Sequence, residues 1–173
     1  QDRVLDVGCN TGFLSFELAR VADCPVIGVD VSERMVTRAD ERLKRGYAPA
    51  DASIGFMRAD ATSFPFSNGS FDRVVCGGST PFVADPLAAV REYRRVVRNW
   101  GFVGELNFFY ESEPPVALLE ELSDRLGTTI DPCTLDDWST LHREAGLAAY
   151  DMAPETAEQA SDAVGAASVD RVV

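Results

Sequence analysis

The sequence predicts one α/β domain with a doubly wound, mostly parallel sheet. Apolar runs such as Val4–Val7 and Val26–Val29 are nearly continuous, helical patterns separate them, and a glycine-containing turn follows the first run. Strands covered on both faces require such runs, and their alternation with helices implies right-handed crossovers. The chain of 173 residues is long enough for a complete hydrophobic core.

Five stretches have the apolar pattern of strands. In chain order they are Arg3–Val7, Pro25–Val29, Ile54–Arg58, Arg73–Cys76 and Phe102–Phe109. Apolar residues at helical spacing predict helices after the first, second and fourth of these strands, and Ser32 is a suitable N-cap for the second helix. The segments "FSNGSF" and "STPFVADP" predict turn-rich connections.

The pattern changes after Phe109. One helix fits Pro115–Leu126, and another is capped by Thr134 and ended by Gly146. The next strand candidate is Leu147–Met152. The first of these two helices is surplus to a simple alternation of strands and helices.

The domain is therefore expected to cover residues 1–153. The surplus helix, within 112–127, fits either a lid over the substrate or a helix used for packing or dimerisation. The alanine-rich tail over 154–173 fits a helix or a final edge strand.

Composition narrows the possible partners. The net charge is −12, from 28 acidic and 16 basic residues, so the surface repels polyanions and we expect no nucleic-acid partner. No apolar run approaches the roughly 20 residues that span a bilayer, so we expect no membrane contact. Four cysteines without a CxxC pair, and a single histidine, predict no metal site and a cytoplasmic protein.

The turn "GCNTG" limits the ligand. Gly8 and Gly12 allow a ligand to lie against bare backbone, and the following helix presents free N–H groups. A dinucleotide-binding turn would also need glycine at positions 10 and 13, where this chain has Asn10 and Phe13. A ligand rich in phosphate is therefore disfavoured.

Two carboxylates follow neighbouring strands. Asp30 ends the second predicted strand and can accept hydrogen bonds from both hydroxyls of a ribose. Asp60 follows the third strand and can accept one from the amino group of adenine. Because the carboxyl ends of parallel strands lie at one edge, we expect a groove there that is the size of adenosine.

Four segments in the correct order resemble one enzyme family. They are "VLDVGCNTGFLSFELA", "VIGVDVS", "FMRADATSFPFSNGSFDRVVCGG" and "LAAVREYRRVVRNWGFVGELNF". Together they resemble the class I S-adenosylmethionine-dependent methyltransferases, in particular a branch that acts on small molecules. The resemblance implies a Rossmann-like fold, S-adenosylmethionine as cofactor and a small-molecule substrate.

The resemblance also implies a set of cofactor-binding residues. These are Asp6, Gly8, Asn10, Gly12, Asp30, Val31, Asp60, Ala61, Cys76 and Gly77. Two features depart from the family: Asn10 often corresponds to glycine, and "NWGF" replaces the usual proline-glycine-glycine turn.

Polar and aromatic residues after the fourth and fifth strands are candidates to face the substrate. They are Ser79, Thr80, Phe82, Glu105, Asn107 and Tyr110. Glu105 is a candidate base if apolar surroundings raise its pKa, but it is more typical of a carboxylate that faces solvent or pairs with an arginine. Tyr110 and His142 are weaker candidates, His142 being more typical of a surface or structural residue. Trp100 and Trp138 are expected in the core, with contact to the substrate as the alternative for Trp138.

The expected activity is therefore transfer of a methyl group to a small molecule. One alternative is a non-catalytic domain that binds S-adenosylmethionine or has a regulatory role. The other is a nicotinamide-dependent oxidoreductase, against which Asn10 and Phe13 argue.

Overall fold

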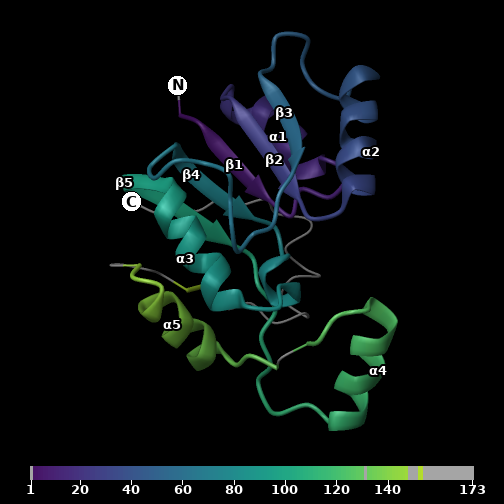
Figure 1. Cartoon of the computed structure of the whole chain (residues 1–173), viewed down its shortest axis with the longest axis vertical. Coiled ribbons are helices and arrows are strands. Elements are labelled where there is room, and N and C mark those ends of the chain that lie inside the picture. The colour runs from purple at the N-terminus through teal and green to yellow at the C-terminus, as the bar shows by residue number, and fades with distance from the viewer. Residues whose placement is uncertain (1, 131, 148–151, 154–173) are drawn as a thin grey trace.

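The computed structural model describes residues 2–130, 132–147 and 152–153. These contain a five-stranded parallel sheet in the order β3-β2-β1-β4-β5 (Figure 1). The strands are β1 (Val4–Val7), β2 (Val26–Asp30), β3 (Ile54–Arg58), β4 (Phe71–Cys76) and β5 (Val97–Glu105). The predicted doubly wound parallel arrangement is confirmed.

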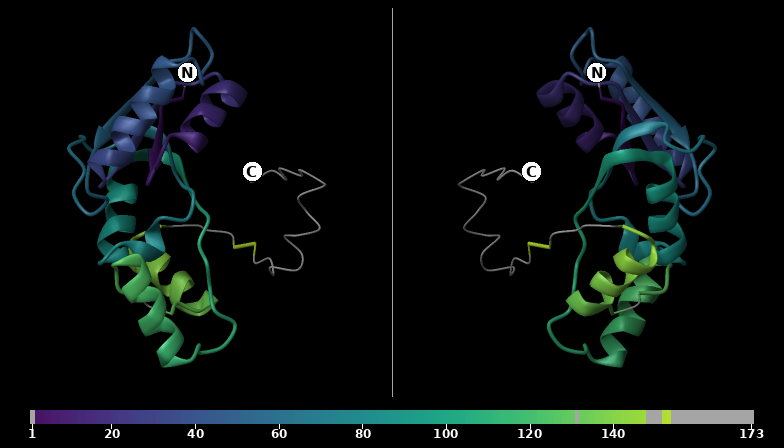
Figure 2. Two further views of the ribbon diagram at one scale, coloured as in Figure 1. Left: turned by 90° about the vertical axis from the view of Figure 1, so that its right-hand side faces the viewer. Right: turned by 90° about the vertical axis from the view of Figure 1, so that its left-hand side faces the viewer.

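Helices cover the sheet from both sides. Helices α1 (Phe13–Ala22) and α2 (Glu33–Lys44) lie on one face, where Arg42 of α2 contacts the ring of Phe16 in α1. Helix α3 (Pro86–Val96) lies on the face opposite α1 (Figure 2). Under α1, Val4 and Val26 pack with Ala19 in a small cluster. The larger cluster, on the α3 side, includes Leu5 of the central strand and the fully buried Tyr93.

The third crossover differs from the other three. The segment between β3 and β4 contains turns and an isolated bridge from Asp60 to Ser63, but no helix. The predicted helices follow β1, β2 and β4 as expected, so strict alternation fails at this one connection. A single turn of 3₁₀ helix, η1 (Thr80–Phe82), precedes α3.

Strand β5 begins earlier than predicted and contains a bulge. Phe71 pairs with Val97 and Arg73 with Phe102, so residues 98–101 loop out of register. A Cβ on Gly101 would lie 2.7 Å from the carbonyl oxygen of Asp72, which explains glycine there. The bulge leaves Trp100 at φ 63° and 99% exposed, so its assignment to the core was wrong.

Two helices follow β5, as predicted. In α5 (Leu135–Glu144), Thr134 and Asp137 form a capping box, and Trp138 is buried as expected. Helix α4 (Val116–Leu126) buries none of its residues and lies apart from the sheet in Figure 1. Most of the predicted strand at 147–152 and all of the tail at 154–173 lie outside the described residues.

Replacing Leu5 with alanine tests the packing of the central strand. Leu5 is fully buried in β1, so Leu5→Ala should lower the free energy of unfolding by about 2–5 kcal/mol through lost contacts and a residual cavity. Denaturant unfolding measures this change. Val21→Ala is the control, because Val21 is 76% exposed and should matter little. An equal loss in both variants would contradict the described core.

Candidate functional site

A groove of about 290 Å³ lies at the carboxyl ends of β1, β2 and β3. It is lined by Val7, Gly8, Val29, Asp30, Val31, Ala59, Asp60, Ala61, Ser79, Phe82, Val83 and Ala84. Open α/β sheets bind ligands at this edge, where the strand order reverses. The sequence-predicted residues Gly8, Asp30, Val31, Asp60 and Ala61 meet here, together with Ser79 and Phe82.

The turn after β1 is held in an unusual backbone conformation. Gly8, Asn10 and Gly12 all have positive φ, of 68°, 51° and 84°. A Cβ on Gly8 would collide with the side chain of Ser79, so glycine is required there. Asparagine is among the few other residues that adopt this conformation readily, which accommodates Asn10.

Arg42 of α2 supports the same turn from outside the groove. Its Nη1 donates hydrogen bonds to the carbonyl oxygen of Thr11 at 3.0 Å and to its Oγ1 at 2.8 Å. The guanidinium also lies over the rings of Phe16 and Tyr47. Sequence reasoning missed Arg42, since nothing in a charged helix marks one arginine as the partner of a distant turn.

The Asp30 carboxylate joins the tips of β1 and β2. Its Oδ2 accepts a hydrogen bond from the N–H of Asn10 and its Oδ1 one from the N–H of Ser32, each at 2.9 Å. Ser32 is the N-cap of α2 as predicted, although its side chain makes no capping bond. The carboxylate is thus held in one orientation, and each oxygen keeps a second lone pair.

Asp60 is oriented by its own loop. Its Oδ1 accepts hydrogen bonds from the N–H and the hydroxyl of Thr62, at 2.9 and 2.8 Å. These bonds, the backbone one first, hold the pKa of Asp60 below its usual range. The groove therefore has an ionised carboxylate at the tip of β3, beside the apolar Ala61 and Val31.

The other predicted cofactor residues lie around the groove rather than on its surface. Asp6 is 1% exposed beneath the turn, with its Oδ2 2.5 Å from the Ser15 hydroxyl that donates to it. Asn10 contributes its N–H to Asp30, and Gly12 begins α1. Cys76 is buried at the end of β4, and Gly77, which follows it, is exposed.

Sequence reasoning missed several apolar lining residues. They are Val7, Val29, Ala59, Val83 and Ala84. The first three immediately precede predicted site residues, so their position at strand ends could have indicated them. Val83 and Ala84 follow η1, and nothing local showed that this segment folds back over the β3 tip.

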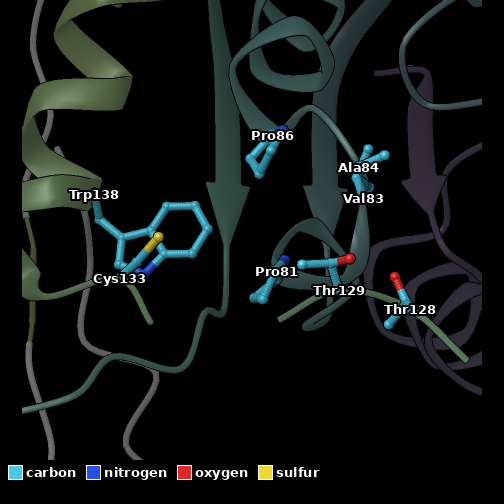
Figure 3. Close-up of a pocket in the computed structure, with 8 residues that line it drawn as sticks. All are labelled: Pro81, Val83, Ala84, Pro86, Thr128, Thr129, Cys133 and Trp138. Carbon is cyan, nitrogen blue, oxygen red and sulfur yellow. The ribbon is translucent and has the colours of Figure 1, made fainter. Parts of the chain in front are cut away.

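A second cavity, of about 230 Å³, adjoins the groove and shares Val83 and Ala84 with it. Figure 3 shows Trp138 and Cys133 on one side of this cavity, facing Pro81 and Pro86. Thr128 and Thr129, which follow α4, complete the lining. The cavity therefore joins the segment after β4 to the segment between α4 and α5.

Glu105 and His142 form a buried pair. The Glu105 side chain is 5% exposed and that of His142 12%, and Glu105 Oε2 lies 2.7 Å from His142 Nε2. Glu105 Oε1 accepts a hydrogen bond from the Thr80 hydroxyl at 2.6 Å. The alternatives of a solvent-facing Glu105 or one paired with arginine were wrong, and His142 is not a surface residue.

The remaining substrate candidates are not groove residues. The Nδ2 of Asn107 lies 3.5 Å from Glu105 Oε1, and the backbone N–H of Tyr110 donates to the Cys133 carbonyl oxygen at 3.0 Å. Thr80, the first residue of η1, is fully buried. Among the described residues, no group of three or more His, Cys, Asp or Glu could hold a metal ion. No described helix is both long and apolar enough to cross a membrane.

The sequence and the fold of this chain match those of known proteins. A family model described as a methyltransferase domain covers residues 4–101. The chain belongs to the class I S-adenosylmethionine-dependent methyltransferases. The departures at Asn10 and "NWGF" are thus variations within this family.

Three relatives illustrate the likeness. The chain is 32% identical over 164 residues to 27-O-demethylrifamycin SV methyltransferase of Amycolatopsis mediterranei, covering 92% of this chain and 57% of that one. It is 33% identical over 125 residues to the ubiquinone/menaquinone biosynthesis C-methyltransferase UbiE of Coxiella burnetii, covering 70% and 48%. A crystal structure of MccD protein superposes with a TM-score of 0.72 at 28% identity, covering 83% and 63%. The chain spans about half the length of the curated relatives.

The burial of Asp6 predicts a pH dependence. Burial raises the pKa of Asp6 to about 6 in the folded protein, above its usual value of 3.8. The folded state therefore binds a proton more tightly than the unfolded state. This tighter proton binding adds roughly 2–3 kcal/mol to the free energy of unfolding below about pH 4. The contribution is lost as the pH rises through about 6.

Unfolding free energies between pH 4 and 7.5 measure this effect, with Asp6→Asn as the comparison. The amide cannot ionise and can still accept the Ser15 hydrogen bond. The difference in stability between the two proteins should therefore shift in favour of Asp6→Asn as the pH rises. A difference that stays constant over this range would contradict the raised pKa.

Proposed function

We propose that this protein binds S-adenosylmethionine in the groove above β1, β2 and β3 and transfers its methyl group to a small molecule. The observation that carries the proposal is the pair of carboxylates, Asp30 and Asp60, at neighbouring strand tips on one groove. The names of the relatives support the substrate class, because rifamycin SV and the ubiquinone and menaquinone compounds are small organic molecules.

The residues of the groove fit the chemistry of this cofactor. Asp30 has spare lone pairs to accept hydrogen bonds from the two ribose hydroxyls. Asp60 can accept from the adenine amino group, while Val31 and Ala61 offer apolar contact to the ring. Gly8 leaves bare backbone beside the groove for the methionine part.

A nicotinamide dinucleotide fits less well. Asn10 follows Gly8 by two residues with an exposed side chain, at the position where a pyrophosphate needs bare backbone. The −12 charge of the chain adds a general repulsion toward phosphate-rich ligands. The same charge favours a small-molecule acceptor over a nucleic acid.

The main contribution of the protein to the reaction is to position the cofactor and the acceptor. The cofactor supplies a methyl group activated by its sulfonium, and holding the reactants in line accounts for roughly 7–11 kcal/mol of a barrier in favourable cases. We place the acceptor near Ser79 and Phe82, with the cavity of Figure 3 beside them. The exposed apolar side chains of Val116, Leu118 and Leu126 on α4 support a lid role for residues 112–127.

We also place the reaction in the cytoplasm. Cys9, Cys24 and Cys76 are buried free thiols, which suits a reducing compartment.

Calorimetric titration tests the proposed cofactor. S-Adenosylmethionine and S-adenosylhomocysteine should each bind at one site, and NAD should give no saturable heat. Assays with a panel of small acceptors then separate an enzyme from a non-catalytic binding domain. Binding of NAD without either adenosyl compound would overturn the proposal.

Replacing Asp30 tests the ribose contact. Asp30→Ala removes the acceptor of the ribose hydroxyls and should weaken S-adenosylhomocysteine binding by about 1–3 kcal/mol, or roughly tenfold to a hundredfold. Asp51→Ala is a matched control, because Asp51 is an exposed carboxylate that does not line the groove. Equal affinities for wild type and Asp30→Ala would show that the ribose binds elsewhere.

A further inference from the structure

A continuous chain of polar contacts runs from α5 to η1. His142 of α5 lies 2.7 Å from Glu105 Oε2 at the end of β5. The other oxygen of Glu105 accepts the Thr80 hydroxyl hydrogen bond at 2.6 Å. Thr80 is the first residue of η1 and is fully buried. Both carboxylate oxygens of Glu105 are thus engaged by groups from two different elements.

The chain of contacts continues from Thr80 to the turn after β1. The Thr80 hydroxyl lies 3.2 Å from Cys76 Sγ, which is 3.0 Å from Ser79 Oγ. Ser79 Oγ donates to the carbonyl oxygen of Val7 at 3.2 Å. The Ser79 side chain also fills the space that a Cβ on Gly8 would need. The contacts therefore end at the wall of the cofactor groove.

Tyr93 determines which group donates in its contact with Thr80. Its hydroxyl lies 3.3 Å from Thr80 Oγ1, and burial raises the pKa of Tyr93 well above its ordinary value. Tyr93 consequently remains protonated and can donate to Thr80. The Thr80 hydrogen is then committed to Glu105, and Thr80 Oγ1 accepts from Tyr93.

The element that these contacts hold has little stability of its own. Within η1, the N–H of Phe82 donates to Ser79 and that of Val83 to Thr80, at 3.0 and 3.1 Å. A single 3₁₀ turn with two such bonds does not persist without tertiary contacts. Ser79, Phe82 and Val83 nevertheless all line the groove. The groove wall therefore depends on what fixes Thr80.

We propose that Glu105 and His142 are positioning residues that fix η1, and through it the Ser79 and Phe82 wall of the groove. The inference rests on the proposed function, since it gives these residues a role in cofactor binding. It also replaces the idea of Glu105 as a general base, because its carboxylate is enclosed and committed to Thr80 and His142. Placement of α5 thereby controls the shape of the cofactor groove.

Amide hydrogen exchange in the cofactor-free protein tests whether Glu105 and His142 fix η1. His142→Leu should accelerate exchange at the Phe82 and Val83 amides by about tenfold or more, whereas His142→Gln, whose Nε2 can donate to Glu105, should restore slow exchange. Asp137→Ala is the matched control. It removes the capping box of the same helix without contact to the network. Melting curves of all variants establish that they fold.

Two results would overturn the inference: unchanged exchange at these amides in His142→Leu, or equal acceleration in His142→Leu and Asp137→Ala. If His142→Leu does not fold, Thr80→Val serves instead, with Thr80→Ser as the variant that keeps the hydroxyl. Acceleration must then appear in Thr80→Val and be absent in Thr80→Ser, and any other pattern contradicts the proposal.

A double-mutant cycle tests the link to the groove. Affinity for S-adenosylhomocysteine is measured for wild type, His142→Leu, Ser79→Ala and the double variant. If the network acts through Ser79, the loss of affinity in the double variant should be smaller than the product of the two single losses, by a factor of about three or more. A loss in the double variant equal to the product of the two single losses would refute the link to the groove. It would not contradict cofactor binding by the protein. Failure of the wild type to bind would instead refute the proposed function, with the exchange experiment still deciding the network.

Discussion

The parallel register of the sheet is the constraint on which the site depends. It aligns β1, β2 and β3 so that Gly8, Asp30 and Asp60 emerge at one edge, although they are far apart in the sequence. The hydrogen bond from the Asn10 N–H to Asp30 then ties the turn after β1 to the tip of β2. Without this alignment the same carboxylates would be unrelated surface charges, and no groove would present them to one ligand.

Much of this edge could be predicted because its signals are local. A buried strand, a glycine that follows it and an acidic residue at the next strand tip each occupy a few consecutive positions. Sequence order then fixes their relation, since parallel strands end at the same side. Thr134 was predicted as a helix cap for the same reason, because the cap and the helix that it begins are adjacent in the sequence.

The features that were missed arise from contacts between distant segments. Glu105 and His142 are 37 residues apart, and the packing of α5 against α3 brings them together. The exposure of Trp100 follows from the register of β5 against β4, which shifts over the bulge. The lack of buried residues in α4 likewise depends on where the helix sits, and its apolar spacing could not reveal that.

A crystal structure of the protein with S-adenosylhomocysteine tests the central claim most directly. Both ribose hydroxyls should lie within hydrogen-bonding distance of the Asp30 carboxylate, with adenine between the tips of β2 and β3 next to Asp60 and Ala61. Nucleoside density at any other place on the molecule, or a groove filled by protein atoms while the compound binds elsewhere, would contradict it.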